Sequence, residues 1–94
     1  MRTIMLGLQE GKIDRALLTP DASYYFSRET LEDFGSSLKP LGTVTTVHEK
    51  EDSLRGGMTF REFDVAFGGG TSITVTTYTM ADGKLEQLLV EGKN

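Results

Sequence analysis

The chain of 94 residues contains no cysteine, and His48 is its only histidine. The lack of cysteine excludes disulfides, thiolate catalysis and cysteine-based zinc sites. A single histidine excludes a multi-histidine metal site within one chain. We therefore expect no metal and no cofactor. Because cysteine-free proteins occur on both sides of a membrane, the composition leaves the compartment open.

Long apolar runs and an excess of basic residues are also missing. No stretch approaches the ~20 apolar residues that span a bilayer. Ten Lys and Arg stand against fourteen Asp and Glu, which gives a net charge of −4. Nucleic acids and anionic membranes attract clustered basic residues, so neither is expected as a partner. The hydrophobic and charged fractions, 37% and 26%, are ordinary for a folded domain, and the length predicts one domain over residues 1–94.

The N-terminal part has the apolar spacing of helices. This spacing predicts helices over residues 1–9, 13–18 and 28–38, with a further one or two turns after Thr19. Thr19 and Ser27 are predicted N-caps, and Pro20 suits the first helical position. The first helix lacks a cap, as if an upstream segment had been removed. We therefore expect a domain excised from, or related to, a larger protein.

The C-terminal part alternates between apolar and polar residues, as strands do. Strands are predicted over residues 43–50, 55–67, 72–80 and 85–91, separated by turns at 51–53, 68–70 and 81–84. Asp82-Gly83 predicts a type I′ turn. A phase change within 55–67 predicts either a β-bulge near Arg61-Glu62 or a strand buried on both faces at its middle. Helices followed by an antiparallel meander define an α+β fold, with the helices on one face of the sheet.

Four segments together resemble a known domain: residues 8–19 (LQEGKIDRALLT), 38–42 (LKPLG), 54–61 (LRGGMTFR) and 78–87 (YTMADGKLEQ). They look like a small C-terminal accessory domain of bacterial serine hydrolases of the β-lactamase/penicillin-binding-protein type. The resemblance implies a cone-like fold similar to nuclear-transport-factor-two-like and cystatin-like proteins. Ser36 and Lys39 match Ser-x-x-Lys, but the partner motifs of these hydrolases do not follow, so no catalytic residue is predicted.

Four residues are candidates for ligand binding: Tyr25, His48, Arg61 and Tyr78. Each also has a structural interpretation. The histidine suits a surface or edge strand, the arginine suits ion pairs with Glu62, Glu86 or a partner, and the tyrosines suit core packing.

Two classes of function fit these observations. The first is a non-catalytic accessory domain that packs against a serine hydrolase, mediates dimerisation or binds a small ligand. The second is a free-standing cone-fold enzyme of the isomerase or cyclase type, with its pocket between helices and sheet. Convergence of His48, Asp64 and Tyr78 inside a cavity would favour the enzyme.

Threonines also predict self-association. Thr45, Thr74, Thr76 and Thr77 suggest a flat, uncharged sheet face, which is easier to bury than one rich in lysine. We expect a symmetric homodimer on this face, or docking of the catalytic domain of the parent protein there.

Overall fold

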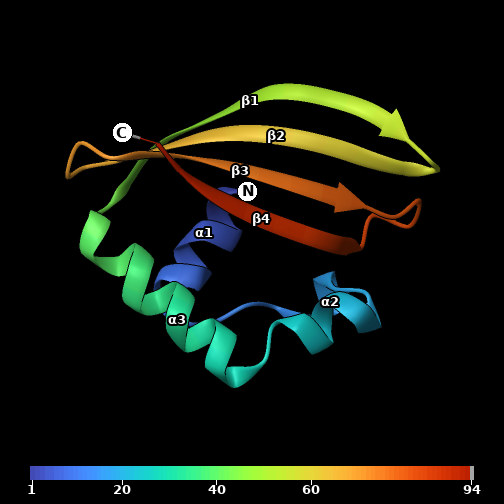
Figure 1. Ribbon diagram of the computed structural model, residues 1–94, viewed down its shortest axis with the longest axis horizontal. Coiled ribbons are helices and arrows are strands. Elements are labelled where there is room, and N and C mark those ends of the chain that lie inside the picture. Colours follow the sequence, from blue (N-terminus) through green and yellow to red (C-terminus); the bar gives the residue numbers. More distant parts are fainter. Residues whose placement is uncertain (94) are drawn as a thin grey trace.

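Helices cover one face of an antiparallel sheet in the computed structural model, which describes residues 1–93 (Figure 1). The helical elements are α1 (Arg2–Gln9), η1 (Arg15–Leu17), α2 (Pro20–Tyr25), α3 (Arg28–Leu38) and η2 (Lys39–Leu41). The strands β1 (Val44–Arg55), β2 (Met58–Phe67), β3 (Ser72–Thr79) and β4 (Leu85–Lys93) pair in the order of the sequence. The predicted α+β fold with a four-stranded meander is therefore confirmed.

The predicted caps begin the second and third helices. The Thr19 hydroxyl accepts a hydrogen bond from the Ala22 amide at 3.2 Å, and the Ser27 hydroxyl accepts one from Thr30 at 3.2 Å. Each bond satisfies an amide that the first helical turn leaves without a partner. The predicted helix at 13–18 is instead a short 3₁₀ turn, in which the Asp14 carboxylate accepts a hydrogen bond from Ala16.

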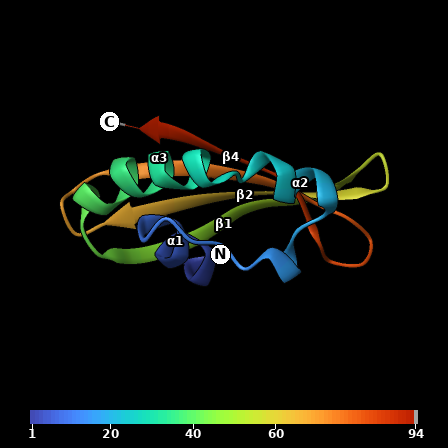
Figure 2. The same cartoon turned by 90° about the horizontal axis from the view of Figure 1, so that it is seen from below.

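The core lies between the helices and the inner face of the sheet. Figure 2 shows α1 on the β1 side and α3 on the β4 side of this face. The buried side chains come from every layer: Met5, Leu8, Phe26, Leu31, Leu38, Val65, Phe67, Ile73, Val75 and Leu88. The predicted apolar stripe of residues 28–38 is thus the inner surface of α3.

The predicted turn at residues 51–53 is wrong. β1 continues to Arg55, and Gly56 and Gly57 connect it to β2 with φ angles of +59° and +84°. A two-residue hairpin that needs positive φ at both positions selects glycine. The polar residues 51–53 belong instead to an exposed edge strand, where polarity does not indicate a turn.

The Asp82-Gly83 connection forms, but not as a type I′ turn. Only Gly83 has a positive φ, of +87°. The Met80 amide donates to the Lys84 carbonyl at 2.8 Å, which closes a three-residue loop. The Asp82 carboxylate accepts a hydrogen bond from the Lys84 amide at 2.9 Å, so its side chain stabilises the loop without a left-handed backbone.

The phase change in β2 comes from burial on both faces. β2 pairs with β3 without a shift, and β1 carries two register shifts against β2, with Thr45 and Lys50 as the extra residues. Of the two predicted explanations, burial on both faces therefore applies to β2, and the bulge lies in the facing strand, where Lys50 is opposite Glu62-Phe63. Phe60 is buried on the outer face, beneath the Arg55 guanidinium at 3.9 Å and beside the Tyr78 ring at 5.2 Å. This small outer cluster explains why Phe60 is out of phase with the inner residues of the strand.

Candidate functional site

The structure brings two of the four candidate residues together. Tyr25, at the end of α2, and Tyr78, on β3, line one cavity of ≈ 390 Å³. The remaining lining residues come from α2, β2 and the beginning of β4: Phe26, Met58, Glu86, Gln87, Leu88 and Leu89. Because Leu88 faces the helices and Gln87 pairs with Tyr78 on the outer face, the cavity lies along the outer edge of β4.

A second cavity of ≈ 420 Å³ adjoins the first and shares Tyr25 with it. Its other lining residues lie on α3 and further along β4: Thr30, Asp33, Phe34, Ser37, Leu38 and Val90. We call the two cavities together the β4 groove. Its lining carries two carboxylates, Asp33 and Glu86, and includes neither lysine nor arginine. The groove is therefore aromatic and apolar with an acidic character.

Contacts at the end of α2 hold Tyr25 in this position. The Tyr25 ring packs edge-on against Phe26, with 5.0 Å between the centroids and 74° between the planes. The Arg15 guanidinium donates to the carbonyls of Ser23 at 2.8 Å and Phe26 at 2.7 Å. Charged donors on terminal carbonyls stabilise a helix end. The pair Asp14-Arg15 thus has a capping role: the Asp14 carboxylate caps η1 and the Arg15 guanidinium caps the end of α2.

Glu86 links the beginning of β4 to the segment before α2 through a hydrogen bond. It is the extra residue at the register shift between Tyr78 and Thr79, and its carboxylate accepts a hydrogen bond from the Thr19 hydroxyl at 2.7 Å. The Thr19 amide donates to the Leu85 carbonyl at 3.0 Å. One end of the β4 groove is therefore fixed by side-chain and main-chain bonds.

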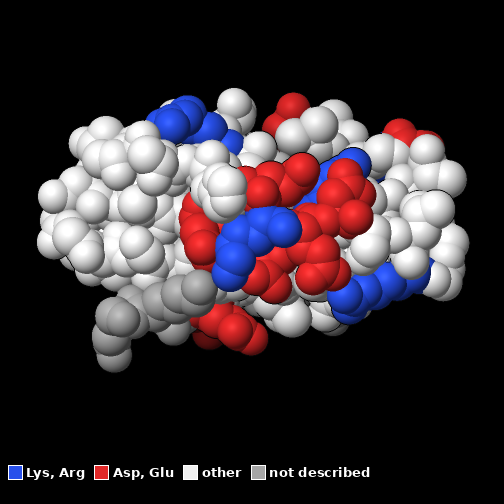
Figure 3. All heavy atoms as spheres, turned by 90° about the horizontal axis from the view of Figure 1, so that it is seen from above, with Lys and Arg blue, Asp and Glu red and all other residues white. Residues whose placement is uncertain are grey.

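His48 and Asp64 lie opposite each other on the outer face of the sheet, away from the helices. On the same face the Lys50 amine pairs with Glu62 at 3.3 Å and with Asp64 at 3.7 Å. We call these three residues the charged cluster. A hydrogen bond to Glu62 is the main cause that raises the pKa of Lys50. Figure 3 shows acidic side chains gathered around a basic one at the middle of this face. Tyr78 shares the face but lies further along, beside Phe60.

The predicted uncharged threonine face is wrong. Thr77 is buried on the inner face, opposite Leu88, whereas Thr74 and Thr76 are on the outer face. The Thr74 hydroxyl donates to Asp64 at 3.4 Å, inside the charged cluster. Side chains alternate between faces along a strand, so consecutive threonines cannot share one face. Self-association stays a prediction, without this surface as its reason.

Arg61 lies on the inner face, where the sheet separates it from His48 and Tyr78. Its guanidinium pairs with Glu49 at 3.5 Å and Asp52 at 3.6 Å and donates to the Thr79 hydroxyl at 3.2 Å. The predicted partners Glu62 and Glu86 are therefore wrong. The Lys50 bulge places Glu49 and Asp52 on the same face as Arg61. Strict alternation along β1 would place these two residues on opposite faces, so the sequence pattern did not reveal them as partners.

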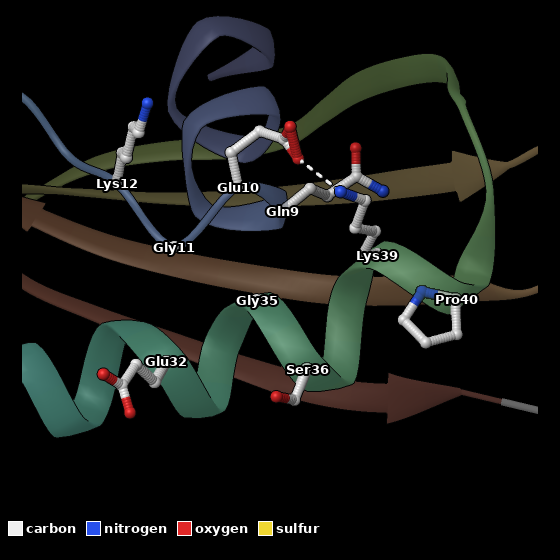
Figure 4. Close-up of a pocket in the computed structure, with 9 residues that line it drawn as sticks. All are labelled: Gln9, Glu10, Gly11, Lys12, Glu32, Gly35, Ser36, Lys39 and Pro40. Atoms are coloured by element: carbon white, nitrogen blue, oxygen red, sulfur yellow. Dashed lines mark ion pairs between the residues drawn. The ribbon is translucent and has the colours of Figure 1, made fainter.

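The literal Ser-x-x-Lys match lies in an open groove of ≈ 750 Å³ between the end of α1 and α3 (Figure 4). The Ser36 hydroxyl and the Lys39 amine point away from each other in this view. The amine pairs with Glu10 at 3.1 Å, and the lysine side chain is 71% exposed. A lysine base requires burial that lowers its pKa. This exposed, paired lysine is a surface cation.

No protein-family model matches the chain, and no curated protein or solved structure shows significant similarity to it. The resemblance to an accessory domain of serine hydrolases therefore rests on the four sequence segments and stays a prediction. In the described part of the chain, no cluster of three or more His, Asp or Glu residues is arranged to hold a metal ion. No helix there is long and apolar enough to cross a membrane.

Proposed function

We propose that the chain is a non-catalytic accessory domain that binds its ligand or partner in the β4 groove. The observation that supports this most is the position of Tyr25, which walls two adjoining cavities at the edge of the sheet. Aromatic side chains provide a large contact area together with a polar group, which suits them to binding surfaces. The sequence resemblance suggests that the partner is the catalytic domain of a serine hydrolase.

The alternative, a cone-fold enzyme, gains no support from the placement of its candidate residues. His48 and Asp64 lie on the outer face, outside the space between helices and sheet. The hydroxyl of Thr19 does contact a carboxylate, that of Glu86. However, Thr19 is buried and its oxygen caps α2, which is a structural role.

Hydrolysis provides the first test. We expect the isolated chain to hydrolyse neither a chromogenic β-lactam nor p-nitrophenyl acetate above the buffer rate, because Ser36 lacks an aligned base. The Ser36→Ala and Lys39→Ala variants should match the wild type in absorbance assays. Turnover by the wild type that both variants lose would contradict a non-catalytic function.

Binding of the neutral dye Nile red provides the second test. Tyr25→Ala should weaken binding about 5–30-fold, because removing an aromatic contact costs on the order of 1–2 kcal/mol. Tyr24→Ala is the matched control: Tyr24 is 88% exposed and is not among the residues that line the groove, so its loss should leave the dye titration unchanged. Equal effects of the two variants, or no effect of Tyr25→Ala, would reject the groove as the binding site.

A further inference from the structure

We infer that the β4 groove binds an extended peptide segment of a partner protein, which adds a strand to the free edge of β4. The segment has apolar side chains at alternate positions and a lysine or arginine at its ends. This inference rests on the proposed function and specifies the form and chemistry of the partner. Strand addition obtains affinity from main-chain hydrogen bonds and specificity from pockets for alternate side chains.

The edge of β4 is open over most of its length. β4 is an outer strand of the sheet, and its other side pairs only with β3. Leu85 forms an isolated bridge with Leu18, and its carbonyl accepts from the Thr19 amide. Within residues 86–93, no further bridge lies on this side in the described structure. Main-chain groups on this edge therefore remain available to an incoming strand.

The other outer strand, β1, is protected against such pairing. Charged residues follow one another from Glu49 to Asp52, and Lys50 forms a bulge. The Arg2 guanidinium also covers its beginning by donating to the Val44 carbonyl at 3.0 Å and to that of Thr45 at 3.2 Å. Charges, bulges and covering groups are the features that keep an edge strand unpaired. The β1 edge of the sheet is thus protected against pairing with another strand, whereas the β4 edge is open.

In contrast to the charged residues of β1, β4 has a run of uncharged residues along its open edge. Residues 87–90 are Gln, Leu, Leu and Val, and Leu89 is 46% exposed. The two cavities flank this run on different sides: one is walled by Phe34 and Val90 below the sheet, and the other extends to Tyr78 on the outer face. An extended peptide directs successive side chains to opposite faces, so the apolar side chains at alternate positions would enter one cavity and the side chains between them would lie over the other.

Charge decides between a basic partner and a second copy of this chain. The groove contributes Asp33 and Glu86, and Glu91 is exposed on the same strand. A symmetric β4–β4 pair would bring these acidic groups close to the acidic groups of the second copy, which disfavours it. A segment with basic ends instead meets opposite charge, and the net charge of −4 attracts it.

A heptapeptide titration tests this inference. The probe is acetyl-Lys-Val-Thr-Leu-Thr-Val-Lys-amide, followed by NMR with the ¹⁵N-labelled chain. We expect a dissociation constant of about 100 μM, with shifts and slowed hydrogen exchange of the amides at 86–90. Replacing both lysines of the peptide with glutamate, or its central leucine with proline, should weaken binding at least about tenfold, because the first repels the groove and the second removes a main-chain donor.

Two variants of the chain complete the experiment. Leu89→Lys should weaken peptide binding at least about tenfold, because lysine protects an edge strand. The matched control is Leu54→Lys, a solvent-exposed position on β1 where the leucine is 81% exposed, and it should bind as the wild type does.

Three outcomes would overturn strand addition: no amide shifts at about 2 mM peptide, equal binding of all three peptides, or equal effects of the two lysine variants. Protection of residues 86–90 without peptide that disappears on dilution would show instead that a second copy occupies the edge. If the peptide does not bind while Tyr25→Ala still weakens dye binding, the groove remains a binding site and only the strand-addition model is rejected.

Discussion

Replacing Phe26 with alanine is expected to lower the free energy of unfolding by about 3–5 kcal/mol. The Phe26 side chain is 0% exposed, and its ring lies 5.0 Å from that of Tyr25 and 5.8 Å from that of Phe34. Its removal leaves a cavity between α2, α3 and the sheet. Domains of this size are stable by about 5–15 kcal/mol, so the loss is a large fraction of the total. Urea unfolding followed by circular dichroism measures it.

Tyr25→Ala is the matched control for this prediction. Tyr25 precedes Phe26 on the same helix end but is 49% exposed, so its loss should cost less than about 1.5 kcal/mol. If Phe26→Ala does not fold, Phe26→Leu should fold with a loss of about 1–2 kcal/mol. Equal losses for Tyr25→Ala and Phe26→Ala would contradict the assignment of the Phe26 ring to the core and of the Tyr25 ring to the exposed surface of the groove.

The features predicted correctly from the sequence are those that depend on neighbouring residues. Thr19 and Ser27 cap helices because each hydroxyl reaches an amide three residues later. The strands follow from alternation, and their meander order follows from short connections. These local signals were sufficient for the α+β fold.

The faces of the sheet were harder to predict because they depend on pairing across strands. The extra residue Lys50 reverses the faces of the later part of β1, so Glu49 and Asp52 both reach Arg61. A one-residue slip exchanges the two faces of a strand, and alternation within one segment does not reveal where it occurs. Of the candidate residues on the sheet, His48 and Tyr78 lie on the outer face and Arg61 lies on the inner face.

The β4 groove was predicted only in part. Tyr25 and Tyr78 were named, but nothing near either residue indicates that β4 would meet the end of α2. The run of uncharged residues at 87–90 was a usable signal. Its meaning depends on β4 being an outer strand, because the same run in a central strand would simply be core.

The connection between η2 and β1 leads to the second large effect: Gly42→Ala should lower the free energy of unfolding by about 2–4 kcal/mol. Gly42 has φ +95° and ψ −168°, a conformation that side chains rarely adopt. An added Cβ would also lie 3.2 Å from the Gly69 amide nitrogen. Gly69, which donates to the Leu41 carbonyl at 3.1 Å, would therefore have to move.

Gly70→Ala separates the two causes of this loss. Gly70 has nearly the same φ, +93°, but an added Cβ there would meet nothing within 4 Å. Its substitution should therefore cost only the backbone strain, about 1–2 kcal/mol, and Gly42→Ala should exceed it by at least about 1 kcal/mol. Thermal and urea unfolding of the two variants give this difference. Equal losses would mean that the turn between β2 and β3 yields to the new methyl group, and that the contact between the two connections does not stabilise the fold.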